Sequence, residues 1–363
     1  MTKIKTAHYL TVSEDPHVQL VSSFQSYKEK KSLRSIIKDA KVFANHFNLD
    51  IKFDNMERKT TLKSCSSVLE VNKCQLRHIK SMLKKEVESK YQDEVKKQPW
   101  VGQYIAKQWQ DKDLHHESYN MLKIWKNIPN VVYSVYTSII QQLISTKVYE
   151  VKKLKGEQGD LNCRLCHISE ENVPHILCSC PAIAQSLYKA RHDRMLRPVY
   201  YEILRMFGFH QDNDRSTRTP WYKESPPKSC VENENVKILW DISIHQDIAP
   251  RNSANKPDIM LRNKKEKQWI IIEGTVCNIG KIIERDKMKT EKYAELRGSL
   301  KRLYPNYEIT QINIVFDFLA GFHKELVSKL HSVGLDNVSE IVKKCQKWII
   351  SQNCEIIKAL YTA

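Results

Sequence analysis

Hydrophobic residues change their spacing between the two halves of this chain. Over residues 1–150 the apolar positions recur every three or four residues among charged ones, as in 75–95, which predicts amphipathic helices. Beyond residue 230 short β-prone apolar runs appear, and helical patterns separate and follow them. Strands are predicted over 236–244, 258–261, 269–276 and 310–319, and helices over 279–303 and from 324 to the carboxyl end.

Breaks in this pattern predict four regions. Residues 1–150 form a mainly helical region, and 151–210 hold a Cys/His cluster with a following helix. Residues 211–230 are polar and rich in proline, which predicts a linker. Residues 231–363 alternate strands and helices, so the fold class we expect is α/β, or α+β overall.

Charge and cysteine usage narrow the class of partner. The chain has 59 Lys and Arg against 42 Asp and Glu, a formal net charge of +17, which favours polyanions such as nucleic acids. No secretory leader and no apolar run of membrane-spanning length occurs, so we expect an intracellular protein with no membrane partner. Ten cysteines in such a chain favour metal ligation and reduced thiols over disulfides.

A cluster of soft ligands lies near the middle of the chain. Four residues within an eighteen-residue stretch match the ligands of a structural zinc site: Cys163, Cys166, His175 and Cys180. Two cysteines separated by two residues present both thiolates from one turn, and the His and Cys that follow can complete a tetrahedron. His167 and Cys178 are rival ligands. A filled four-ligand site has no open position, so its role would be structural.

A second constellation predicts chemistry. Asp258 follows Pro257 in one predicted strand, and Glu273 lies in the next, with the charged stretch 263–268 as the turn between them. Such a hairpin can bring the two carboxylates together, where they would bind Mg²⁺, or Mn²⁺ in its place. The competing interpretation is that Glu273 points to solvent, although an acid inside an apolar strand is costly without a partner.

The two acids resemble the metal-binding carboxylates of a nuclease. Such nucleases usually carry a lysine two residues after the second acid, and that position is Thr275 here. A substitute is available in the following helix. At about 100° per residue, Lys289 projects onto the middle of the apolar stripe of that helix and Lys292 onto its flank. A lysine among apolar neighbours needs a carboxylate partner or a catalytic role, so both are candidates and Lys289 is preferred.

Between about residues 138 and 326 the chain resembles the carboxyl-terminal part of reverse-transcriptase proteins from non-LTR retrotransposons that use a restriction-enzyme-like endonuclease. The order of several short motifs makes the resemblance fairly specific. These are Cys163-Arg164-Leu165-Cys166, Pro174-His175-Ile176-Leu177, Cys180, Arg191-His192-Asp193, Trp221-Tyr222, Ile238-Leu239-Trp240-Asp241, Lys256-Pro257-Asp258-Ile259, Glu273 and Lys289-Thr290-Glu291-Lys292-Tyr293.

The resemblance implies a zinc knuckle, with the four ligands named above, beside a nuclease of PD-(D/E)xK fold. In that nuclease the lysine has moved onto the following helix, which implies Asp258, Glu273 and Lys289 or Lys292 as the catalytic residues. The implied reaction is a nick in target DNA whose 3′ hydroxyl primes reverse transcription. DNA, the RNA of the element and a reverse-transcriptase protein acting in trans are the implied partners, and the nucleus the implied location.

The chain departs from this family because it contains no aromatic-x-Asp-Asp box of a polymerase palm, so we expect no reverse transcription from this chain alone. Three functions stay open. The first is a Mg²⁺-dependent DNA endonuclease, with Mg²⁺ catalytic and Zn²⁺ structural. The second is a nucleic-acid-binding protein that has lost cleavage, which Thr275 would suit. The third is a zinc-stabilised protein-interaction module.

Overall fold

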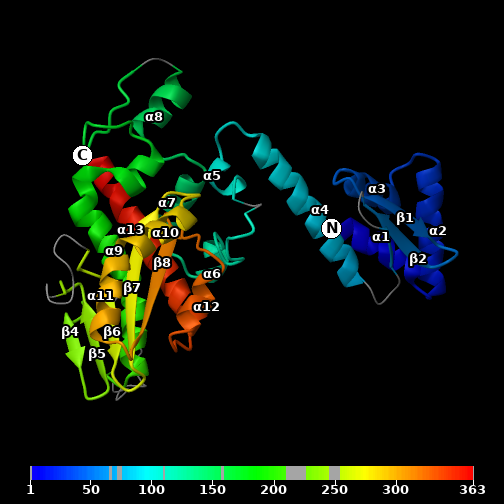
Figure 1. Ribbon diagram of the computed structural model, residues 1–363. Helices are drawn as coiled ribbons and strands as arrows, with labels where there is room; N and C mark the ends of the chain where they lie inside the picture. Colours follow the sequence, from blue (N-terminus) through cyan, green and yellow to red (C-terminus); the bar gives the residue numbers. More distant parts are fainter. Residues whose placement is uncertain are drawn as a thin grey trace. The chain divides into compact units, whose positions relative to one another are not determined.

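The structure is a computed structural model that describes residues 2–64, 68–71, 76–108, 111–156, 159–209, 226–244 and 254–362 (Figure 1). The chain divides into two compact units, Met1–Pro99 and Trp100–Ala363, and each is described by itself. The fold class is mixed α/β, with a separate sheet in each unit. Most of the predicted linker, and Trp221 and Tyr222 of the family resemblance, lie outside the described residues.

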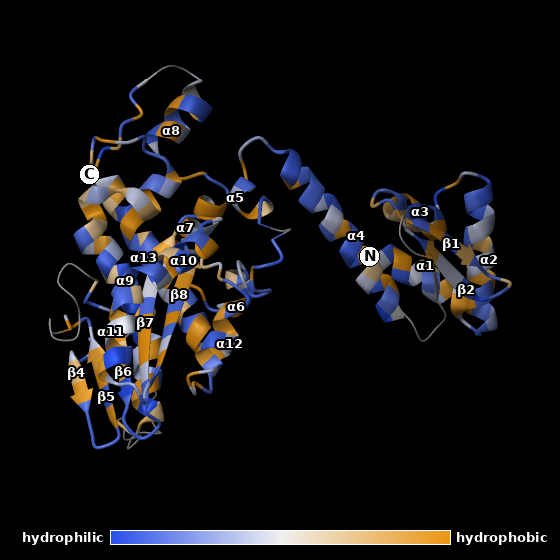
Figure 2. Cartoon of the chain, viewed as in Figure 1, coloured by the Kyte–Doolittle hydropathy of each residue, from blue (hydrophilic) through white to orange (hydrophobic). Residues whose placement is uncertain are grey.

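The first unit combines helices with a small antiparallel sheet of order β1-β2-β3. Its elements are α1 (Thr2–Val12), α2 (Pro16–Lys30), α3 (Ile36–Asn45), β1 (Asp50–Asp54), β2 (Lys59–Lys63), β3 (Val68–Val71) and α4 (Leu76–Lys97). Helices are the longer elements of this unit, and the sequence pattern did not predict the sheet. The reason is that β1 and β2 are five residues each and bury only alternate positions such as Ile51 and Leu62. So short an alternation is a weak signal beside long helical patterns such as the mostly hydrophilic α4 (Figure 2).

The second unit contains the Cys/His cluster and the acidic pair. Its first elements are α5 (Gln103–Ala106), α6 (Met121–Ile124), α7 (Asn130–Ile140), α8 (Lys147–Tyr149), the π-helices η2 (Glu150–Lys155), η3 (His175–Ser179) and η5 (Ala184–Tyr188), the 3₁₀ turn η4 (Pro181–Ile183), and α9 (Lys189–Met206). The sheet region follows, with β4 (Cys230–Glu232), β5 (Val236–Trp240), β6 (Ile259–Asn263), β7 (Gln268–Cys277), α10 (Ile282–Lys292), α11 (Ala294–Leu303), β8 (Glu308–Asp317), α12 (Leu326–His331) and α13 (Val338–Thr362).

The sheet of this unit has the order β4-β5-β6-β7-β8. Neighbouring strands are antiparallel except β7 and β8, which are parallel and connected through α10 and α11. The four predicted strands are present as β5 to β8, and β4 is an additional edge strand. The helix predicted over 279–303 is interrupted at Tyr293, which leaves helical geometry with φ −106° and ψ 16°.

Helices cover both faces of this sheet. Ile270 and Ile272 of β7 belong to a large core shared with α9 and α13, whereas Trp269 and Ile271 belong to a separate core shared with α11. Successive strand residues point to opposite faces, so one apolar strand supplies both cores. Each such side chain contributes about 1.5–3 kcal/mol on burial. In this three-layer arrangement β7 lies between α9 and α13 on one face and α11 on the other.

We expect Gly274→Ala to destabilise this packing. A Cβ at Gly274 would lie 2.8 Å from Cε of Met195 and 2.9 Å from the methyl groups of Leu196, both on α9. Overfilling a packed contact costs about 1–3 kcal/mol, measurable as a lower midpoint of urea denaturation. Gly298→Ala is the matched control, because its added methyl group meets only Arg302 at 3.6 Å and alanine favours the helix there. Equal stability of both variants would contradict the close approach of α9 to β7.

In the described part of the chain no helix is both long and apolar enough to cross a membrane.

Candidate functional site

The two predicted acids meet at the end of the β6–β7 hairpin. Ile259 of β6 pairs with Ile272 of β7, so the next residues outward, Asp258 and Glu273, lie opposite each other. The backbone N–H of Asp258 donates to Oε1 of Glu273 over 3.0 Å. Glu273 is only 1% exposed, so the alternative in which it points to solvent is wrong.

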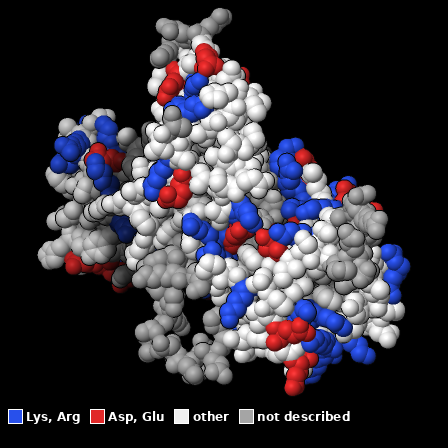
Figure 3. Space-filling view, turned by 90° about the vertical axis from the view of Figure 1, so that its left-hand side faces the viewer, with Lys and Arg blue, Asp and Glu red and all other residues white. Residues whose placement is uncertain are grey.

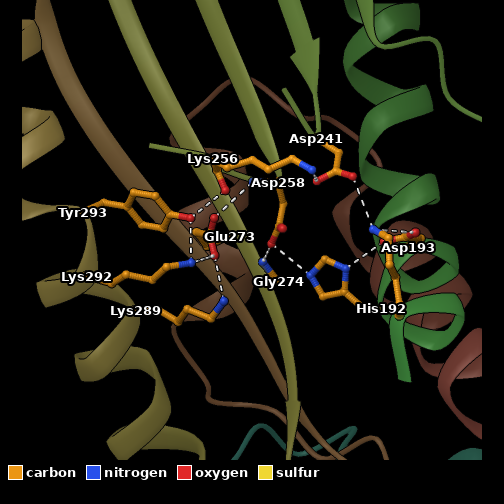
Figure 4. A network of polar contacts seen from close by, with 11 residues as sticks. His192, Asp193, Asp241, Lys256, Asp258, Glu273, Gly274, Lys289, Lys292 and Tyr293 are labelled. Atoms are coloured by element: carbon orange, nitrogen blue, oxygen red, sulfur yellow. Dashed lines mark hydrogen bonds and ion pairs between the residues drawn. The ribbon is translucent and has the colours of Figure 1, made fainter. Parts of the chain in front are cut away.

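Two lysines of α10 approach the buried carboxylate of Glu273 (Figure 4). Nζ of Lys289 donates to Oε2 of Glu273 over 2.7 Å, whereas Nζ of Lys292 lies 3.8 Å from the same oxygen. Lys292 instead donates to the hydroxyl of Tyr293 over 2.7 Å, and that hydroxyl donates to the carbonyl of Lys256. Burial and the neighbouring Glu273 raise the pKa of Tyr293, so its hydroxyl stays protonated. Lys289 is thus the direct partner of Glu273.

Side chains of β8 fix the position of α10. Gln311 donates to the carbonyl of Lys289 over 2.8 Å, and Asn313 donates to the carbonyl of Asp286 over 2.9 Å. The bond from Gln311 satisfies a carbonyl in the last turn of the helix, where backbone donors are missing, and the bond from Asn313 is an additional contact one turn earlier. They hold the last turns of α10 against the sheet, with Lys289 directed at Glu273.

Asp258 is held from the other side by α9. Its Oδ2 accepts from the backbone N–H of Gly274 over 2.7 Å and from Nε2 of His192 over 2.9 Å. Nδ1 of His192 contacts Asp193 at 3.0 Å. Burial lowers the pKa of His192, but the bonds to Asp193 and Asp258 outweigh it and raise the pKa to about 9. Burial opposes ionisation of Asp258, yet His192 and Gly274 keep its pKa below the ordinary value. At neutral pH the contact is therefore between a carboxylate and an imidazolium.

An outer ring of ion pairs joins α9 to the loop after β5. Lys189 lies 3.3 Å from both Asp193 and Asp241, and Lys256 lies 2.9 Å from Asp241. These groups are partly exposed, so each pair stabilises the fold only slightly. The pair between Lys256 and Asp241 and the contact between His192 and Asp193 are drawn in Figure 4.

The structure brings together the four residues predicted as catalytic, Asp258, Glu273, Lys289 and Lys292, at the open end of the β6–β7 pairing inside the sheet. Sequence reasoning assigned no role to His192, which contacts Asp258 directly. A signal for it was present, because His192 precedes the buried residues Met195, Leu196 and Val199 at helical spacing. That spacing places the imidazole on the face of α9 that packs on the sheet.

The donor set suits a hard cation. All contacts of the Asp258 carboxylate fall on Oδ2, and among the described residues no donor contacts Oδ1. Each carboxylate has about four lone-pair positions, so Glu273 can also accept more than its two bonds. Oxygen ligands of this kind are those that Mg²⁺ and Mn²⁺ prefer.

The Cys/His cluster forms a second candidate metal centre. The ligand atoms of Cys163, Cys166, His175 and Cys180 all lie within 4.8 Å of one another. Sγ of Cys163 is 4.0 Å from Sγ of Cys180, and Sγ of Cys166 is 3.3 Å from Nε2 of His175. A tetrahedron with Zn–S bonds of about 2.3 Å has edges of about 3.8 Å, so the four residues could hold a metal ion such as zinc.

The rival ligands lie outside the group. Neither His167 nor Cys178 belongs to the set of atoms that could share one ion. His167 instead closes the Cys-x-x-Cys turn with a positive φ of 56° and an N–H bond to the carbonyl of Cys163. Burial raises the pKa of Cys163, and it raises that of Cys180 to about 12, so their thiolates need a cation nearby.

Buried polar groups hold the cluster in shape. The hydroxyl of Tyr188 accepts from the N–H of Cys180 and donates to the carbonyl of Ile176 over 2.7 Å. Glu171 is fully buried and accepts from the backbone N–H and the guanidinium of Arg164. The ligand loops are therefore ordered by contacts beyond the four ligands themselves.

No protein-family model matches this chain, and no curated protein matches it.

Proposed function

We propose that the protein is a Mg²⁺-dependent DNA endonuclease that nicks target DNA and derives from a non-LTR retrotransposon. The observation that carries the proposal is the buried Glu273, which contacts both Asp258 and Lys289. A PD-(D/E)xK restriction-endonuclease-like fold is part of the proposal. It is supported by two acids that face each other at the open end of the β6–β7 pairing, and by a lysine on the following helix, held against the parallel strand β8.

Each residue of the site has a role in this proposal. Asp258 and Glu273 would hold Mg²⁺, which lowers the pKa of a bound water and neutralises charge on the scissile phosphate. Lys289 would orient the attacking water and stabilise the negative charge that develops on the phosphate. His192 holds Asp258 ionised and directed at the site, and is a positioning residue. The Cys/His cluster, filled with Zn²⁺, would shape the neighbouring surface.

The charge of the protein supports DNA as the substrate. Its formal net charge is +17, and one face shows several groups of lysine and arginine side chains with acidic ones between them (Figure 3). Phosphate contacts from such groups bind without sequence preference and weaken as salt rises. Element RNA, a reverse-transcriptase protein acting in trans, and a nuclear location belong to the same proposal.

A catalytically inactive nucleic-acid-binding protein is the second candidate. Thr275 occupies the position where such nucleases usually have lysine, and the 2.7 Å ion pair between Lys289 and Glu273 occupies one metal-binding oxygen. In this case DNA binding would depend on salt but not on Mg²⁺. Weak, salt-independent DNA binding would favour the third candidate, a protein-interaction module.

A plasmid-nicking assay tests the proposal. Supercoiled DNA is incubated with zinc-loaded protein in Mg²⁺, Mn²⁺, Ca²⁺ or EDTA, beside the double variant Asp258→Ala/Glu273→Ala. We expect nicking by the wild type in Mg²⁺ or Mn²⁺ only, and none by the double variant. Equal nicking by both proteins would show that a different site, or a contaminant, cuts the DNA.

The two lysines should differ in importance. We expect Lys289→Met to lower the nicking rate by about 10²–10³-fold, because it removes a charged donor from the reacting phosphate. Lys292→Met should lower it by less than about tenfold, because Lys292 lies 3.8 Å from Glu273 and donates to Tyr293. Single-turnover rates with saturating protein measure both effects. A larger loss in the Lys292 variant would reverse the assignment.

A further inference from the structure

Arg191 is a buried arginine close to the acidic site, and no carboxylate of the described residues pairs with it. Arg191 of α9 is 2% exposed, and its Nη1 donates to Oδ1 of Asn353 over 2.8 Å. The Cζ atom of its guanidinium lies over the ring of Tyr188, 5.1 Å from the ring centroid, and the guanidinium contacts the thiol of Cys178. Within the described ranges no carboxylate forms an ion pair with Arg191, and its Nε has no hydrogen-bond partner.

An unpaired cation in such a place is costly. Arginine stays charged at all accessible pH values, so burial cannot be relieved by losing the proton. Truly buried charges in folded proteins are paired or bind a ligand, because removal from water costs several kcal/mol per ion. The aromatic ring of Tyr188 and the amide of Asn353 offset only part of this cost. Arg191 therefore needs an anionic partner, and the described residues do not supply one.

A pocket of about 280 Å³ lies beside this guanidinium. Arg191 and His192 line one side of it, and Thr275 and Val276 of β7 line another. The volume far exceeds the roughly 10–15 Å³ that one water requires. Lys189 lies at its edge with 48% of the side chain exposed. Of the described residues that line the pocket, three are basic and none is acidic, which suits an anion with several acceptor oxygens.

The pocket and the acidic site share the side chain of His192. His192 lines the pocket and also contacts Asp258 at 2.9 Å. Thr275 follows Glu273 by two residues, which is about 6.6 Å along a strand. A DNA strand advances about 3.4 Å per nucleotide along the helix axis, so this separation corresponds to a step of one or two nucleotides.

We propose that this pocket binds a phosphate of the DNA strand next to the phosphate held at Asp258 and Glu273, with Arg191 as its main ligand. This proposal extends the nuclease proposal. It rests on the nuclease proposal to identify the bound group as a phosphate next to the one that is cut. Arginine suits this role because its planar fork can donate two parallel hydrogen bonds to phosphate oxygens. The bound phosphate is the missing counterion of Arg191, and it sets the position of the strand relative to the acids.

Equilibrium binding of a short DNA duplex to Arg191→Met tests the proposal. Fluorescence anisotropy in Ca²⁺ over about 50–200 mM KCl yields both the affinity and its salt dependence. We expect about tenfold weaker binding than the wild type and a salt slope smaller by about 0.9, the values for one lost phosphate contact. The control is Arg205→Met, on the same helix about 21 Å away at 1.5 Å per residue. Equal loss in both variants, or none in either, would overturn the proposal.

Replacing a buried arginine can disturb folding, so a second pair of variants keeps the backbone and Arg191 intact. Cys178→Asp places a carboxylate beside the guanidinium, and Cys178→Asn places an uncharged group of the same shape there. If Arg191 binds phosphate, the Asp variant should bind DNA at least about tenfold more weakly than the Asn variant. The reason is that the introduced carboxylate would pair with Arg191 in place of the DNA phosphate. Equal affinity of the two would show that the guanidinium has only a structural role.

The outcomes also separate this proposal from the nuclease proposal. Absence of Mg²⁺-dependent nicking by the wild type would remove the nuclease, while an Arg191-dependent affinity would keep the phosphate pocket. If the wild type nicks DNA, Arg191→Met should raise KM about tenfold with a small change in kcat, since the contact is made before and during cleavage. Nicking with KM and affinity independent of Arg191 would remove the pocket alone.

Discussion

Glu273→Gln will abolish metal-dependent nicking and leave the fold intact. The amide keeps the shape of the side chain, and its oxygen can still accept from the N–H of Asp258. It removes one of the two charges that would hold Mg²⁺, and it leaves Lys289 without its ion-pair partner. We expect the nicking rate to fall by at least about 10³-fold, because the metal supplies several kcal/mol of transition-state stabilisation.

DNA affinity measured in EDTA should be unchanged or higher in this variant, because a negative charge next to the DNA is removed. The matched control is Glu308→Gln on the parallel strand β8, where the carboxylate is exposed and contacts only Gln268 among the described residues. That control should nick as the wild type does. A Glu273→Gln variant with wild-type nicking would show that Glu273 is not a metal ligand.

Cys163→Ser will release the metal of the Cys/His cluster and strongly destabilise the second unit. Cys163 and Cys180 are fully buried, and they belong to the same core as α9 and the face of β7 that carries Ile270 and Ile272. Structural zinc contributes about 10–16 kcal/mol of apparent binding free energy in isolated zinc fingers. Because the unit has a large core besides, we expect a smaller loss here, about 5 kcal/mol or more.

Zinc content by atomic spectroscopy and thermal unfolding check this result. We expect one zinc per wild-type chain and less than about a tenth of that in the variant. The control is Cys354→Ser, because Cys354 is also buried and its thiol donates to the carbonyl of Ile350, a bond that serine can make. It should keep its zinc and lose about 1 kcal/mol. Equal zinc content in all three proteins would show that the cluster holds no metal.

The sequence predicted the elements around the site well where the pattern was long or the chemistry unusual. The strands β5 to β8 each carry an apolar run, and the four zinc-type ligands lie close together in the chain, so local information suffices. The strands β1 and β2 were missed because five residues of alternation are a weak signal. The break at Tyr293 was also missed, because that residue fits the apolar stripe and its hydroxyl bond to Lys256 is a long-range contact.

The sequence by itself determined which groups are present: two acids in neighbouring strands, two lysines on the following helix, and four soft ligands in one stretch. Only the tertiary structure decided their partners. It buried Glu273 against Lys289, brought His192 from sixty-six residues away to Asp258, and placed Arg191 at a pocket whose described lining residues include no carboxylate. The physical reason is that hydrogen bonds and ion pairs depend on distances of a few ångströms. Packing of α9 and α10 on opposite faces of one sheet sets those distances, and no local pattern encodes them.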